Sequence, residues 1–106
     1  MILLFQNEKG NILMKNQYYA NGQKAYEQKG NIRTYFYKTG DLRAKGKFID
    51  ENMEGKWIFN RNSGELWQIG HFLQNEKHGE WIRYDKKGEV EYHAEFVEGK
   101  LNKKII

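Results

Sequence analysis

The chain repeats itself at a fixed interval, and this repeat limits its possible folds more than any other feature of the sequence. Residues 55–66 read GKWIFNRNSGEL, and residues 79–90 read GEWIRYDKKGEV. The same spacing of 24 separates turn glycines, aliphatic residues, phenylalanines and tryptophans: Gly40, Gly64 and Gly88; Leu42, Leu66 and Val90; Phe48, Phe72 and Phe96; Trp57 and Trp81. A period of this length indicates stacked units, each burying its apolar face against its neighbours.

Each unit predicts β-hairpins. The segments are short, aromatic and β-branched, and their apolar residues do not follow helical spacing. The turns KTGD, NSGE and KKGE, with ANGQ earlier, place a glycine where a two-residue hairpin loop needs a positive φ. Longer loops, IDENMEG and LQNEKHG, are predicted to lead into the next hairpin. The predicted fold is therefore all-β, an antiparallel meander of successive β-hairpins with about ten short strands.

The repeat also predicts how the chain is divided. A chain of 106 residues without a Pro-rich or Ser-rich linker is expected to form one domain. Within residues 1–106 we expect irregular N-terminal units over 1–39, then regular units over 40–63, 64–87 and 88–106, the last one truncated. In the first thirty residues we expect a strand at MILLF, a turn at Gly10, a longer strand and a turn at Gly22.

The predicted loops set a register that can be checked. A two-residue loop at Ser63 and Gly64 places Trp57 across from Gly70, and the equivalent loop at Gly88 places Trp81 across from Ala94. A residue with little or no side chain leaves a groove in which an indole of the neighbouring strand can lie. A four-residue turn at 75–78 then brings Phe72 beside Trp81. One continuous aromatic face is the expected result.

The units YYANGQ, GDLRAKGKFIDENMEGKW and GELWQIGHFLQNEKHGEWIRYDKKGEV resemble MORN-type repeats, in particular the bacterial MORN-repeat variant whose members are often labelled antitoxins of toxin–antitoxin systems. The resemblance covers about residues 10–100. It departs from the pattern in three places: the first unit lacks its G-x-W, Asn60 stands where Tyr84 is the equivalent, and Ala94 replaces a glycine. The resemblance implies a ribbon of β-hairpins whose usual role is binding rather than catalysis.

Candidate catalytic and metal-ligating residues do not assemble into a predicted site. His71 and His93 are expected on the face opposite the tryptophans with Ile82 between them, about 10 Å apart, too far for a shared zinc ion. Glu89, Glu91 and Glu95 lie near His93 without a second carboxylate across a cleft. The chain has no cysteine, and a single serine in a turn. We therefore expect no enzyme, no metal site and no cofactor.

The residues free to recognise a partner are those that break the period. The face opposite the tryptophans is predicted to carry Ile58, Ile69 and Tyr84 in one cross-strand row, and Trp67 has no aromatic counterpart in the other units. An apolar cluster with a basic rim resembles a protein interface. The predicted partner-binding residues are Trp67, Ile69, Tyr84, Ile58, Ile82, Lys45, Lys47 and Arg43. The alternative, that the ribbon rolls up or dimerises and buries this face as a second core, stays open.

Two functions follow. The first is a non-enzymatic protein–protein interaction module, antitoxin-like or immunity-like, that masks another protein, such as a toxin or effector, through the face around Trp67; a homodimer through a sheet edge or face stays open. The alternative is binding to an anionic membrane surface, because residues 1–53 hold the whole net charge of +4. That surface would use Tyr18, Tyr19, Phe36 and lysines 15, 24, 29, 38, 45 and 47.

Two further expectations concern nucleic acid and location. No nucleic-acid partner is expected, because packing already accounts for the aromatic face. The apolar run MILLF is shorter than the core of a signal peptide, which predicts a cytoplasmic protein.

Overall fold

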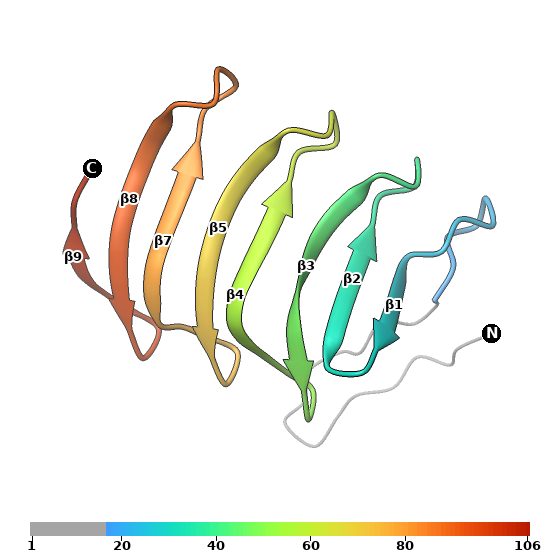
Figure 1. Ribbon diagram of the computed structural model, residues 1–106, viewed down its shortest axis with the longest axis horizontal. Helices are drawn as coiled ribbons and strands as arrows, with labels where there is room; N and C mark the ends of the chain where they lie inside the picture. Colours follow the sequence, from blue (N-terminus) through green and yellow to red (C-terminus); the bar gives the residue numbers. More distant parts are fainter. Residues whose placement is uncertain (1–16) are drawn as a thin grey trace.

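The computed structural model describes residues 17–106, which form a single antiparallel sheet without a helix (Figure 1). Its strands are β1 (Tyr26–Lys29), β2 (Ile32–Phe36), β3 (Leu42–Ile49), β4 (Asn52–Asn60), β5 (Leu66–Leu73), β6 (Glu76–Lys77), β7 (Gly79–Tyr84), β8 (Val90–Val97) and β9 (Lys100–Lys104). They lie in the order β1-β2-β3-β4-β5-β7-β8-β9, with β6 paired to β5. Neighbours in sequence are neighbours in space, so the predicted all-β meander is confirmed.

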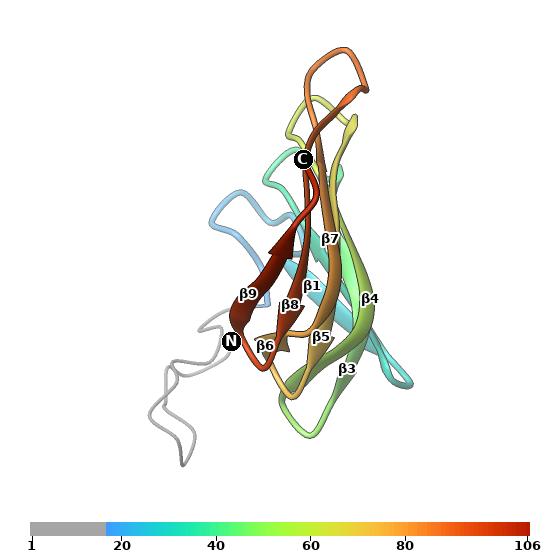
Figure 2. The ribbon, with the colours of Figure 1, turned by 90° about the vertical axis from the view of Figure 1, so that its left-hand side faces the viewer.

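The sheet is a single twisted layer, which is plain when it is seen edge-on (Figure 2).

Of the features predicted for the first thirty residues, the turn at Gly22 is present, with a φ of 89°. The strands expected before it and the turn at Gly10 lie outside the described residues.

The glycine turns all have one geometry, and it differs from the predicted two-residue loop. In the hairpin of β4 and β5, the Gly64 N–H donates to the Arg61 carbonyl (2.9 Å), and the Arg61 N–H donates to the Glu65 carbonyl (2.8 Å). The same pair of bonds recurs in the turns that end at Gly22, Gly40 and Gly88. Three residues therefore form each loop, and its glycine adopts φ between 84° and 101°.

A β-bulge restores the register that the longer loop would otherwise shift. On β5, Leu66 pairs with Asn60 and Gln68 pairs with Phe59, so Trp67 is the extra residue. The bulge recurs one repeat earlier at Arg43 on β3 and one repeat later at Glu91 on β8. The three-residue loop shifts the pairing of the two strands by one residue, and the bulge shifts it back. Trp57 therefore still pairs with Gly70, and Trp81 with Ala94.

At the other end of the sheet the predicted longer loops are instead tight turns. Asp50 and Glu51 join β3 to β4 with φ of 50° and 65°, and Gln74 and Asn75 follow β5 with φ of 49° and 71°. Residues other than glycine rarely adopt this left-handed conformation. The four-residue turn predicted at 75–78 is therefore wrong, because the turn is Gln74 and Asn75 and the next two residues form β6. The Phe72 and Trp81 rings still meet, with centroids 5.5 Å apart.

The core of this single layer is a row of indoles over glycines. Trp57 is fully buried and Trp81 is 6% exposed. A methyl group built on Gly46 would overlap the Trp57 indole, and one on Gly70 would overlap the Trp81 indole. Each tryptophan thus lies over the glycine of the strand that precedes it, although the register alone had suggested that Trp57 would lie over Gly70.

This direction explains why the third position of the series is not glycine. Ala94 takes the position of Gly70 in the next unit and is fully buried. The residue that takes the position of Trp81 one unit later is Ile105, so no third indole requires the space. Ala94 therefore keeps its methyl group, whereas glycine is required wherever a tryptophan follows.

Candidate functional site

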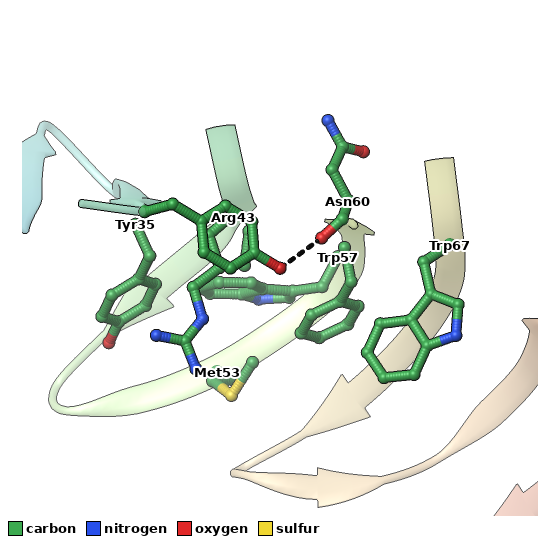
Figure 3. A pocket seen from close by; sticks show the side chains of 9 residues that line it. Tyr35, Arg43, Met53, Trp57, Asn60 and Trp67 are labelled. Carbon is green, nitrogen blue, oxygen red and sulfur yellow. Dashed lines mark hydrogen bonds between the residues drawn. The ribbon is translucent and has the colours of Figure 1, made fainter. Parts of the chain in front are cut away.

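The aromatic side of the sheet contains an open hollow of about 430 Å³ where β2, β3, β4 and β5 lie side by side. It is lined by Tyr35, Tyr37, Arg43, Ala44, Met53, Trp57, Phe59, Asn60 and Trp67. Figure 3 shows Tyr35 and Trp67 at opposite sides, with Trp57 between them and the Arg43 guanidinium on the Tyr35 side, near Met53. A volume of this size and an aromatic lining with few polar groups are typical of binding pockets.

The bulges bring Trp67 and Arg43 into this hollow. Simple alternation along a strand predicts both side chains on the face opposite Trp57, and this placement is wrong. The extra residue of a bulge disrupts the alternation and redirects a side chain, so both residues line the hollow together with Trp57. The site therefore combines two neighbouring units, one supplying a cation and the other an indole.

The hollow has a positive rim and no acidic lining residue. The Arg43 guanidinium lies 5.5 Å from the centre of the Tyr37 ring, and the Arg61 guanidinium lies 5.7 Å from the centre of the Trp67 ring. Such cation–aromatic contacts hold a guanidinium in place without neutralising it. The arrangement suits an apolar or aromatic group that carries a carboxylate beside it.

Hydrogen bonds between successive turns hold the wall of the hollow. The Tyr37 hydroxyl donates to the Asn60 carbonyl (2.7 Å), as drawn in Figure 3, and an Arg61 Nη2 donates to the Tyr84 carbonyl (2.9 Å). One unit earlier, the Tyr19 hydroxyl donates to the Phe36 carbonyl (2.7 Å). Each unit thus uses a long side chain at the start of its turn to fix the next turn.

The other predicted binding residues lie on the opposite face, which places the predicted surface on two sides of the sheet. Ile58 pairs with Ile69, and Ile69 pairs with Ile82, so three isoleucines form a row across β4, β5 and β7. Tyr84 was predicted in this row, but Ile82 takes its place, because Gln68 pairs with Arg83. Lys45 continues the row on β3, and Lys47 follows it on the same strand.

The two histidines contact different groups of Glu80, His93 its carboxylate and His71 its backbone carbonyl. A ring nitrogen of His93 lies 2.8 Å from a Glu80 carboxylate oxygen, and a ring nitrogen of His71 lies 3.0 Å from the Glu80 carbonyl oxygen. Glu91, predicted beside His93, instead pairs with Arg83 at 2.9 Å. Within residues 17–106, no group of three or more metal-ligating side chains comes together.

Two of the lysines of the membrane hypothesis lie beside the same glutamate. Lys24 and Lys29 each lie 3.5 Å from a Glu27 carboxylate oxygen, Lys38 is in a glycine turn, and Lys15 lies outside the described residues. No helix in the described part of the chain is long and apolar enough to cross a membrane.

Comparison of the chain with protein-family models, with curated proteins and with solved structures finds no match. The resemblance to MORN-type repeats therefore stays a prediction made from the residues. The sequence pointed to Trp67 and Arg43 through their break with the period, whereas Tyr35, Tyr37, Met53 and Phe59 were missed. Two of them could have been identified in the same way, because the residue 24 positions after Tyr37 or Phe59 is of a different type.

Proposed function

We propose that this protein is a non-enzymatic binding module that recognises another protein through the aromatic hollow. The observation that supports it best is that two side chains without a counterpart in the other units, Arg43 and Trp67, line one pocket whose walls are already held by the fold. Interfaces concentrate their binding energy in such aromatic and arginine side chains. Because the hollow is formed before a partner binds, the cost of ordering it on binding is low.

The chemistry of the lining defines the partner segment. It carries a large aromatic or aliphatic side chain, which fills the space between Tyr35 and Trp67, with Asp or Glu next to it in sequence to meet Arg43. The antitoxin-like or immunity-like role implied by the MORN resemblance is one case of this function, in which the segment belongs to a toxin or effector.

Selection from a displayed library of random peptides tests the proposal. Enriched peptides should contain a large apolar residue within two positions of Asp or Glu. Their binding should fall by more than about tenfold in Trp67→Ala and in Arg43→Glu, as expected for an anchor and its charged neighbour. Leu66→Ala is the matched control, because Leu66 is 39% exposed in the same bulge and does not line the hollow.

Two results would contradict the proposal. One is the absence of any enriched peptide class; the other is a class that binds Trp67→Ala as tightly as the unchanged protein. In both variants the thermal unfolding midpoint is measured as well, so that a lost fold is not mistaken for a lost contact.

A further inference from the structure

The face opposite the hollow has a charge pattern that runs across its strands. On the β3 and β4 side, Lys47 and Lys56 are exposed, and no ion pair within residues 17–106 holds either one. On the β7 and β8 side, Glu80 and Glu95 are exposed and pair across the strands. Glu80 also lies 2.8 Å from a ring nitrogen of His93, and Glu95 pairs with Lys103 on β9. The isoleucine row of β4, β5 and β7 lies between the two groups. The exposed lysines of β3 and β4 and the exposed glutamates of β7 and β8 therefore lie on either side of the apolar row.

We propose that two copies of this chain pack through this face, related by a two-fold axis that runs parallel to β5. A two-fold interface uses the same patch on both copies, so that patch must complement itself. Rotation about an axis along β5 brings β4 of one copy over β7 of the other, and β3 over β8. This is the one orientation that places the basic side of each copy over the acidic side of its partner.

The strand register shows which charged side chains of the two copies would face each other. Lys56 and Glu80 share one cross-strand row, since Lys56 pairs with His71, and His71 meets Glu80. Rotation about β5 keeps each row over itself, so Lys56 of one copy faces Glu80 of the other. Lys47 lies beside this row, because Gly46 pairs with Trp57 and Lys47 pairs with Glu54 beyond a bulge. The same rotation places β3 over β8, where Glu95 pairs with Glu80, so Lys47 lies near Glu95 of the other copy.

The apolar row complements itself in the same arrangement. Ile69 lies on β5 and meets its own copy at the axis, while Ile58 on β4 lies over Ile82 on β7. Sheets that pack face to face lie about 10 Å apart, with mean strand directions within about 30° of each other, and the parallel β5 strands of this arrangement meet that condition. The described sheet belongs to a molecule measuring 44 × 34 × 22 Å, whose broad face can cover the roughly 800 Å² that each partner of a standard interface buries.

Charge reversal gives a test that only this pairing passes. One variant carries Lys47→Glu and Lys56→Glu, and the other carries Glu80→Lys and Glu95→Lys. Each alone juxtaposes like charges and should weaken self-association by more than about tenfold. Mixed in equal amounts, the two variants present opposite charges to each other and should form a one-to-one heterodimer. Analytical ultracentrifugation and native mass spectrometry measure the masses.

Matched controls separate this surface from net charge and from folding. Lys38→Glu combined with Lys87→Glu changes the charge of the chain equally in two exposed turns, and should leave the dimer intact. Ile69→Lys, a change on the solvent side of a folded strand, should give a monomer. A wild-type chain that is monomeric at all concentrations overturns the proposal and leaves the face to a different partner; reversal variants that still dimerise alone, or fail to pair when mixed, overturn it too.

Discussion

Two regions of this sheet recur with the period of the sequence, and they differ in what recurs. In the row that crosses β3, β4, β5 and β7, backbone and side chain repeat together, since an indole lies over a glycine twice. At the hairpin bulges only the backbone repeats, because the extra residue is Arg43, then Trp67, then Glu91. The first region holds the sheet together. The second fixes a direction for a side chain and leaves its chemistry open.

The largest expected effect separates the two tryptophans. Trp57→Ala should lower the free energy of unfolding by about 3–5 kcal/mol, because it removes a fully buried indole from the row. Trp67→Ala should cost about 1 kcal/mol or less, since its half-buried ring lines an open hollow. Urea denaturation of both variants measures the difference. Equal losses would mean that the bulge residue belongs to the structural row.

A smaller effect concerns the hydrogen bonds between successive turns. In each of them a side chain donates to a backbone carbonyl of the next unit, although the donor is a tyrosine in two units and an arginine in the third. Tyr37→Phe removes only the hydroxyl that donates to the Asn60 carbonyl, and should cost about 0.5–1.5 kcal/mol. Tyr92→Phe is the matched control, because the Tyr92 ring contacts the Arg83 guanidinium and its hydroxyl takes no part in the hydrogen bonds between turns. A cost for Tyr37→Phe no larger than that of the control would show that these bonds do not stabilise the array.

The smallest expected effect is a gain in stability. Glu51 adopts a φ of 65° in a tight turn, at the position taken by Gly99 two units later. A left-handed conformation costs a residue other than glycine about 1–2 kcal/mol, partly offset by the greater freedom of glycine when unfolded. Glu51→Gly should therefore raise the free energy of unfolding by about 0.5–1 kcal/mol.

The equivalent change at Asn75 is the control for that gain. The Asn75 side chain accepts a hydrogen bond from the Met53 N–H (2.7 Å) and donates to the Asn52 side chain (2.8 Å). Asn75→Gly relieves the same backbone strain but removes these bonds, so no gain is expected. Thermal unfolding of both variants provides the comparison, and a loss of stability in Glu51→Gly would contradict it.

The sequence predicted the parts of this fold that depend on pairing between small and large residues. Gly70 and Trp57 are spaced so that one register satisfies them, and that register is confirmed. The direction of the indole was not predictable, because both neighbours of β4 offer glycine at the same level. The turns at Asp50 and Gln74 escaped prediction because residues other than glycine rarely take a positive φ.

The candidate site was predictable in its residues but not in its geometry. Trp67 and Arg43 were identified from their break with the period, yet alternation assigned them to the other face. The bulge could not be predicted from the register, because its extra residue cancels the shift that the three-residue loop makes. The two changes together leave the strand pairing as predicted. The isoleucine row was predicted with Tyr84 as its last member because the prediction assumed a turn at 75–78. The turn is at Gln74 and Asn75, and the pairing with β5 shifts by two residues between β6 and β7, so Ile82 lies beside Ile69.

The central claim is that glycine is present in the row because the next tryptophan lies on it. A double-mutant cycle of Gly70→Ala and Trp81→Ile, followed by urea denaturation, tests it most directly. With Trp81 present, Gly70→Ala should cost about 1–3 kcal/mol, because the added methyl overlaps the indole. In the Trp81→Ile background, which imitates Ala94 and Ile105, the cost should vanish; an equal cost in both backgrounds would contradict the claim.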